Sequence, residues 1–214
     1  MKRKIRVIIL EDHTILTETL TIALSNFEAL EVMGFFTTGA EALNYLQNEE
    51  IDVAIVDYRL PDTDGISFLV ETRSLPHPPQ TVFLSMHGDS VIIQEAFRQG
   101  ATAFLPKTAS TEELVNTIIC ASDGEQYLSP ELTAVFERHV KLPDRLDPRV
   151  SPALDQKKID ILQHMRQGKT ISEMQAILSI PAKEIRGEID SIVKALGVDT
   201  QIQALIKSIQ MGII

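Results

Sequence analysis

The chain has 214 residues, of which 44% are hydrophobic and 23% are charged, and these proportions are typical of a soluble globular protein with one or two domains. Its single cysteine excludes an internal disulfide framework and is typical of a protein in the reducing cytoplasm. The apolar run behind the basic N-terminus is too short for a signal peptide, and no stretch approaches the length of a membrane span. We therefore expect a cytoplasmic protein without a membrane partner.

The net charge of −10 is unevenly distributed along the chain. Residues 1–125 carry 8 Lys and Arg against 19 Asp and Glu, a net charge of −11. Residues 151–214 carry 8 against 7, a net charge of +1. We expect the first part of the chain to repel nucleic acid. The last part is almost uncharged overall, so its net charge should neither repel nor strongly attract nucleic acid.

Strand-like and helix-like segments alternate five times over the first part of the chain. Each strand is a short apolar run, and the segment behind it has apolar residues at helical spacing. The predicted strands are 5–10, 31–37, 53–56, 80–84 and 103–105, and the predicted helices are 13–25, 38–46, 66–73, 89–99 and 110–121. This alternation predicts an α/β fold, a doubly wound five-stranded parallel sheet with helices on both faces.

In the last part of the chain the sequence pattern predicts helices and no strands. Ser129-Pro130 is typical of a helix start, and residues 142–152 contain three prolines, which indicates a linker. Four helices are predicted behind it, over 155–166, 170–178, 182–196 and 200–209. A tight break between the second and third suggests a small all-α helix-turn-helix domain. The predicted organisation is a first domain, a helix with a linker, and a helix-turn-helix domain, over residues 1–124, 125–150 and 151–214.

Polar residues stand at the carboxyl ends of the predicted strands. Glu11 and Asp12 follow the first strand, Asp57 the third, Ser85 the fourth and Lys107 the fifth. Neighbouring strands lie about 4.8 Å apart, so these side chains can converge on one site at the edge where parallel sheets bind ligands. Three carboxylates suit a hard cation such as Mg2+, and a lysine is expected to offset their repulsion. The serine hydroxyl suits a phosphoryl oxygen.

Each of these residues also has a purely structural interpretation. Glu11 and Asp12 could cap the first helix, Ser85 could cap the fourth, and Lys107 could be an ordinary surface lysine. A carboxylate at the end of a strand, such as that of Asp57, has three alternative roles: it binds a sugar or a metal ion, it acts as a nucleophile, or it caps a helix. That all five residues stand at strand ends by chance is less probable than a purely structural role for any single one of them. We therefore interpret the five residues as one site.

The same residues resemble the receiver domain of two-component response regulators over about residues 4–124. The pattern comprises Glu11-Asp12, Asp57 with Pro61 and Asp64-Gly65, Ser85, and Phe104-Leu-Pro-Lys107. The resemblance implies that Asp57 is the phosphoacceptor, that Glu11 and Asp12 bind Mg2+ together with it, and that Ser85 and Lys107 contact the phosphoryl group.

The resemblance also carries expectations about partners and switching. It implies a sensor histidine kinase as phosphoryl donor and a homodimer on phosphorylation. Phe104 matches the family's aromatic switch position, which would act together with Ser85. The alternative for Phe104 is a core residue of the fifth strand, and both interpretations can hold.

Residues 151–214 resemble the LuxR/NarL type of helix-turn-helix domain. This implies that 182–196 is the recognition helix and that Lys183, Arg186 and Lys194 contact DNA. The family usually has a hydroxyl residue where Glu184 stands and often a histidine where Glu188 stands, so this recognition helix is atypical. An acid there either accepts a hydrogen bond from a cytosine amino group or repels phosphate. We expect repulsion at Glu184, and both alternatives stay open at Glu188.

Two functions are consistent with these features. The first is a response regulator that controls transcription by binding DNA, which the intact helix-turn-helix core favours. The second is a response regulator whose degenerate helix-turn-helix domain acts by protein–protein interaction, which the acidic recognition helix favours. A third, a phosphohydrolase with a strand-end aspartate nucleophile, usually needs a second aspartate where Arg59 stands. We therefore expect no enzymatic turnover.

Overall fold

The computed structural model describes residues 3–86, 88–137 and 154–214. The chain divides into two compact units, the first formed by Met1–Gly88 and Gln99–Gln126, the second by Asp89–Arg98 and Tyr127–Ile214. Residues 138–153, which include the whole predicted linker over 142–152, lie outside the described part. No helix in the described ranges combines the length and the apolar character needed to cross a lipid bilayer.

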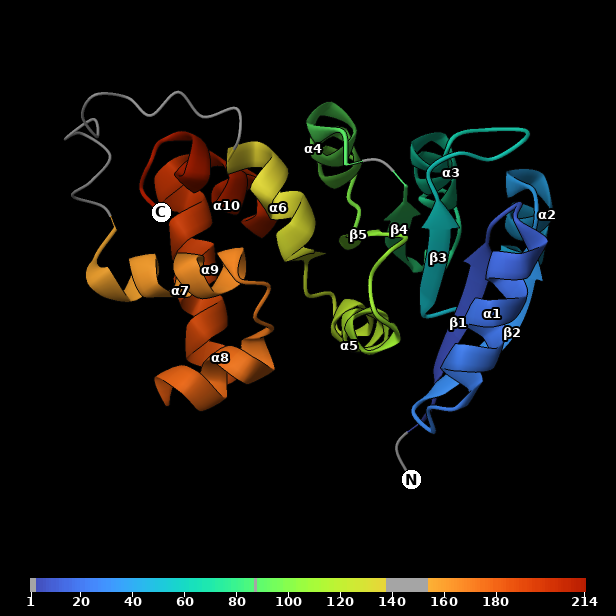
Figure 1. Ribbon diagram of the computed structural model, residues 1–214, viewed down its shortest axis with the longest axis horizontal. Coiled ribbons are helices and arrows are strands. Elements are labelled where there is room, and N and C mark those ends of the chain that lie inside the picture. The colour runs from blue at the N-terminus through green and yellow to red at the C-terminus, as the bar shows by residue number, and fades with distance from the viewer. Residues whose placement is uncertain (1–2, 87, 138–153) are drawn as a thin grey trace. The chain divides into compact units, whose positions relative to one another are not determined.

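The first unit is built on a parallel sheet (Figure 1). Its strands are β1 (Ile5–Leu10), β2 (Leu30–Phe36), β3 (Val53–Asp57), β4 (Gln80–Ser85) and β5 (Ala103–Pro106). They lie in the order β2-β1-β3-β4-β5, with all four pairings parallel. The chain crosses from one side of β1 to the other after β2, and parallel sheets bind ligands at the carboxyl edge beside such a switch point.

The doubly wound parallel sheet is confirmed, and its five predicted strands are those of the first unit. A further strand, β6 (Tyr127–Leu128), belongs to the second unit and was not predicted. It has two residues, and a segment of that length shows no hydrophobic periodicity from which a strand could be predicted.

Helices of the first unit form two layers around its sheet. Their bounds are α1 (Thr14–Ser25), α2 (Gly39–Leu46), α3 (Gly65–Thr72) and α5 (Thr111–Ser122), whereas α4 (Ser90–Arg98) belongs to the second unit. Helix α1 packs with α5, and α2 packs with α3. The central strands are buried between the layers, because Val7 to Leu10 of β1 are wholly inaccessible and every residue of β3 is buried. Unbroken apolar runs are what a strand covered on both faces requires.

Two acids fix the loop that follows Asp57. Asp64 is the N-cap of α3 and accepts hydrogen bonds from the backbone N–H of Ile66 (3.0 Å) and Ser67 (2.9 Å). Asp62 accepts from the first N–H groups of α2, those of Gly39 (2.9 Å) and Ala40 (3.0 Å). Burial raises the pKa of Asp62, but these backbone hydrogen bonds outweigh it and hold the pKa below its usual value. Both acids therefore serve helix N-termini.

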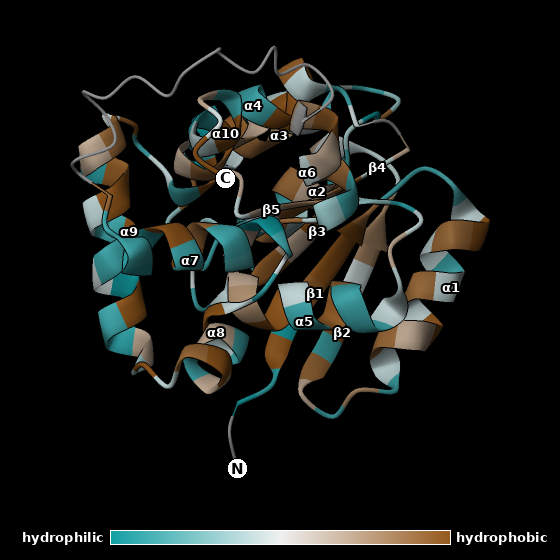
Figure 2. Cartoon of the chain, turned by 60° about the vertical axis from the view of Figure 1, so that its left-hand side comes forward, coloured by the Kyte–Doolittle hydropathy of each residue, from teal (hydrophilic) through white to brown (hydrophobic). Residues whose placement is uncertain are grey.

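The second unit contains five helices besides α4 among the described residues. They are α6 (Pro130–Glu137), α7 (Gln156–Arg166), α8 (Ile171–Leu178), α9 (Ala182–Leu196) and α10 (Gln201–Gln210). Helix α9 packs against α7, α8 and α10. It is amphipathic, as the alternation of hydrophobic and hydrophilic residues in Figure 2 shows, and it buries Ile185, Ile189, Ile192 and Leu196.

The turn between α8 and α9 matches the predicted break. Ser179 ends α8 in the left-handed conformation, with φ 56° and ψ 35°, and Pro181 stands immediately before α9. A non-glycine residue is rarely found in this conformation. The side chains of Thr170 and Glu173 form a capping box at the start of α8. These features produce the helix-turn-helix order that the sequence predicts.

We predict that Gly65→Ala destabilises the protein, because an added Cβ would lie 2.6 Å from the Phe83 ring and 2.7 Å from the backbone oxygen of Asp57. Overpacking of this kind costs about 1–3 kcal/mol. The control is Gly187→Ala in α9, where an added Cβ meets no described atom within 4 Å apart from the adjoining residues and backbone of that helix, so helix propensity should stabilise the protein by up to about 1 kcal/mol. Urea unfolding measures both changes. A Gly65→Ala protein as stable as its parent would contradict the packing described here.

Candidate functional site

The carboxyl ends of four neighbouring strands bring the predicted site residues to one edge of the sheet. Glu11 and Asp12 follow β1, and Asp57 ends β3. Ser85 ends β4, and Lys107 follows β5. These strands are adjacent in the order β1-β3-β4-β5, so the parallel topology alone accounts for the convergence.

Lys107 joins two of the acids. Its Nζ lies 2.6 Å from Oδ2 of Asp57 and 2.7 Å from Oε2 of Glu11. The three side chains are only 7%, 7% and 3% exposed. Burial lowers the pKa of Lys107, but hydrogen bonds to Asp57 and Glu11 outweigh it, so the net pKa is raised and the ammonium stays charged. Lys107 is therefore not an ordinary surface lysine.

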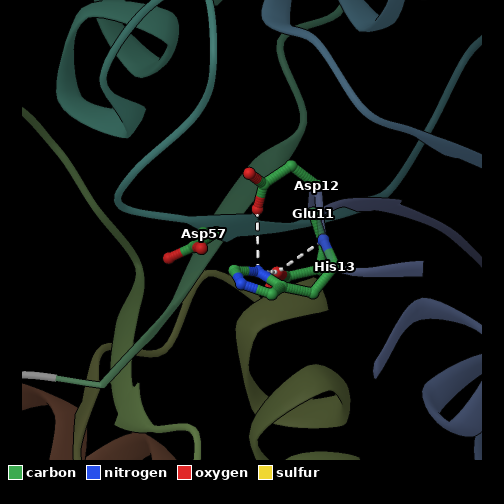
Figure 3. Close-up of side chains that lie close together, drawn as sticks. All are labelled: Glu11, Asp12, His13 and Asp57. Carbon is green, nitrogen blue, oxygen red and sulfur yellow. Dashed lines mark hydrogen bonds and ion pairs between the residues drawn. The ribbon is translucent and has the colours of Figure 1, made fainter. Parts of the chain in front are cut away.

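His13 joins the cluster, although the sequence predicts it only as the start of the first helix. Its Nδ1 lies 2.7 Å from Oε1 of Glu11 and 2.8 Å from Oδ1 of Asp12 (Figure 3). The hydrogen bond with Glu11, followed by the charge of Asp12, raises the pKa of His13. Its position directly behind the acid pair was the available signal. The two acids turn toward His13 and Lys107, so their interpretation as caps of α1 is wrong.

The acids are close enough together to hold a cation. One ligand atom from each of Glu11, Asp12, His13 and Asp57 lies within 4.8 Å of the others. Three carboxylates face one lysine, so the cluster retains negative charge that a divalent ion would offset. Oxygen donors suit a hard ion, and the 36% exposure of the Asp12 side chain leaves that acid open to solvent.

Ser85 and Phe104 lie beside this cluster. Ser85 is 6% exposed, and its backbone carbonyl accepts a hydrogen bond from the Lys107 N–H at 2.9 Å, which ties the loop after β5 to the end of β4. Phe104 is fully buried and stacks on Phe83, with ring centroids 5.5 Å apart. Phe83 is also the ring nearest to Gly65. Phe104 is thus a core residue of β5, and its role as a switch stays a prediction.

The three basic residues predicted to contact DNA lie on α9. Lys183, Arg186 and Lys194 are all exposed. Sequence reasoning missed two further lysines, Lys157 and Lys158, which stand at the start of α7 and form ion pairs with acids of α9. Ion pairs between helices that are far apart in the sequence have no periodic signal that would reveal them.

A doubly wound sheet with three acids, a serine and a lysine at its carboxyl edge defines a receiver-type phosphoacceptor unit. The response regulator receiver domain family matches residues 7–119, more than half of the chain. The protein belongs to the response regulators.

Its similarity to known proteins extends over both units. The probable transcriptional regulatory protein NarL of Mycobacterium tuberculosis is 26% identical over 211 residues, which cover 99% of this chain and 96% of NarL. The transcriptional regulatory protein UhpA of Escherichia coli K12 is 28% identical, with 93% of this chain and 95% of UhpA covered. The chain also superimposes on the solved structure of the response regulator RcsB in complex with DNA, with a TM-score of 0.59 and 21% identity. The superposition covers 98% of this chain and 99% of RcsB, and it shows that the two proteins share a fold.

We predict that Lys107→Met lowers the free energy of unfolding by roughly 3 kcal/mol without divalent ions, because Glu11 and Asp57 would lose the cation between them. Mg2+ should restore more stability to the variant than to the parent, since the ion would replace the missing charge. Urea unfolding in chelator and in Mg2+ tests both effects. Lys4→Met, at an exposed position, is the control, and an equal loss in both variants would contradict the bridging role.

Proposed function

We propose that the chain is a response regulator that accepts a phosphoryl group on Asp57 and thereby controls transcription through its C-terminal DNA-binding domain. Family membership and the full-length likeness to transcriptional regulators support this function. The observation that carries it is the placement of Asp57 at the end of a fully buried central strand, bound to Lys107 and within reach of the acid pair. The proposed domains are a receiver, a helix with a linker, and a helix-turn-helix domain, over residues 1–124, 125–150 and 151–214.

The roles of the acids follow from their positions. Asp57 supplies the nucleophile: a carboxylate oxygen forms a bond to phosphorus as the bond to the donor's leaving group breaks, and an acyl phosphate results. Glu11 and Asp12 would hold Mg2+ together with Asp57, and the ion would neutralise carboxylates that otherwise repel an anionic donor. Lys107 and Ser85 would contact the phosphoryl oxygens, Lys107 as a point charge.

The phosphoryl group is proposed to act as a signal rather than as a step in turnover. The residue two positions after Asp57 is Arg59, and an arginine does not replace the acid that a phosphohydrolase of this type uses as general acid or base. The relatives described above are transcriptional regulators. A sensor histidine kinase is the proposed donor. Attraction of Ser85 to the new charge, with repacking of Phe104, is the proposed switch, and a homodimer is its proposed product.

DNA is the proposed target of the second unit. Lys183, Arg186 and Lys194 are exposed on α9, and the guanidinium of Arg186 is the group on this helix able to bind guanine in a bidentate manner. Acidic residues on this helix were the reason to consider a domain that acts only on other proteins. Because Glu184 and Glu188 bind lysines of α7, their acidity no longer favours that alternative.

The acceptor assignment is tested by labelling the full-length chain with a small acyl phosphate and Mg2+ and measuring the intact mass. We expect one phosphoryl group on the parent and none on Asp57→Asn. Asp62→Asn is the matched control, because Asp62 lies in the same loop but caps α2, and it should label like the parent. Undiminished labelling of Asp57→Asn would defeat the assignment.

A further inference from the structure

Two lysines at the start of α7 lie against two acids of α9, within the second unit. Lys157 forms an ion pair with Glu184, and its Nζ also lies 3.0 Å from Oε1 of Glu188. Lys158 lies 3.2 Å from Oε2 of Glu188 and 2.9 Å from the N-cap carboxylate of Asp155. Glu188 therefore binds both lysines, one with each oxygen.

Burial and electrostatics make Glu188 the centre of this network. Its side chain is 21% exposed, against 51% for Glu184. Hydrogen bonds from Lys157 and then Lys158 lower the pKa of Glu188, while the pKa of each lysine is raised, mainly by Glu184 for Lys157 and by Asp155 for Lys158. Glu188 stays ionised, and its charge is offset inside the domain before any DNA approaches.

Helix geometry separates these acids from the surface that faces away from the core. At about 100° per residue, Lys183, Gly187, Asp190 and Lys194 fall within an arc of about 60° on α9. This outer stripe lies opposite the buried isoleucines. Glu184 and Glu188 lie about 100° and 140° around the helix from Lys183, on the side that contacts α7.

The outer stripe has the composition of a surface that can approach DNA closely. It carries two exposed lysines, and apart from the adjoining residues and backbone of α9 itself no described atom lies within 4 Å of the position that a Cβ on Gly187 would occupy. Asp190 is its one acid. It is exposed, and within residues 154–214 and the other described ranges it has no ion-pair partner. Of the three acids on α9, Asp190 alone would bring an uncompensated negative charge to a phosphate backbone.

We propose that Glu184 and Glu188 are positioning residues that hold α9 on α7, and that DNA meets α9 through the outer stripe and the adjoining Arg186, where Asp190 limits affinity. This inference rests on the proposed DNA-binding function and assigns roles to its acids. Glu188 neither reads a base nor repels phosphate, because its two oxygens are occupied by Lys157 and Lys158. Binding strength then depends on neutralisation of phosphates by the stripe's lysines and on the opposing charge of Asp190.

The DNA test compares Glu188→Gln with Asp190→Asn in the phosphorylated full-length protein. Both variants remove one negative charge from the same helix, so any effect of net charge alone is the same in both. At low salt we expect Asp190→Asn to tighten binding to a mixed-sequence duplex by on the order of fivefold, and Glu188→Gln to change it less than twofold. An equal or greater gain in DNA affinity for Glu188→Gln would mean that Glu188 also faces DNA, and this result would overturn the proposal.

The positioning role has a readout that needs no DNA. A double-mutant cycle of Lys157→Met and Glu188→Gln should show a coupling of about two- to fivefold in the unfolding equilibrium constant. The same cycle with Asp190→Asn in place of Glu188→Gln should be additive. Absence of coupling at Glu188 would overturn the positioning role. If the coupling is found but neither the parent nor Asp190→Asn binds any duplex, the DNA-binding function fails and the positioning role stands.

Discussion

Lys107 holds its ammonium between the carboxylates of Glu11 and Asp57 in a nearly inaccessible position, and the functional edge of the sheet depends on this contact. Two buried carboxylates side by side would repel strongly without a cation between them. One lysine can offset one of these charges but not all three carboxylates. The charge that remains makes the site suitable for a divalent ion and then for an anionic phosphoryl donor.

The order of the strands makes this contact possible. Asp57 and Glu11 stand on neighbouring strands at the switch point, and Lys107 reaches them from beyond β4. Beneath Asp57 the packing is tight, because Gly65 fits against the Asp57 backbone and the Phe83 ring, which stacks on Phe104. A change of charge at Asp57 therefore acts on a close-packed group of side chains, in which small shifts must be accommodated by neighbours.

Much of this arrangement follows from local sequence signals, and the rest from contacts that have no local signal. Strand β3 was predictable because four apolar residues end at a carboxylate, and α8 because Thr170 and Glu173 form a capping box. Strand β6 was missed because two residues show no period. His13 was missed because a histidine after an acid pair has many ordinary roles.

The acids of α9 show most clearly where sequence reasoning ends. From the sequence, Glu184 and Glu188 are two negative charges on a recognition helix, and repulsion of DNA is a natural expectation. Their partners stand about thirty residues earlier on α7 and become visible only when the two helices are packed together. Charge on one helix is therefore a poor guide to the field that the folded domain presents.

We propose that phosphorylation of Asp57 controls DNA binding. The most direct measurement is the affinity of the full-length chain for DNA at fixed salt, before and after treatment with an acyl phosphate and Mg2+, in the parent and in Asp57→Asn. We expect that this treatment changes the affinity of the parent for DNA and leaves the affinity of Asp57→Asn unaltered. The same change in both proteins, or no change in a parent shown to be phosphorylated, would contradict it.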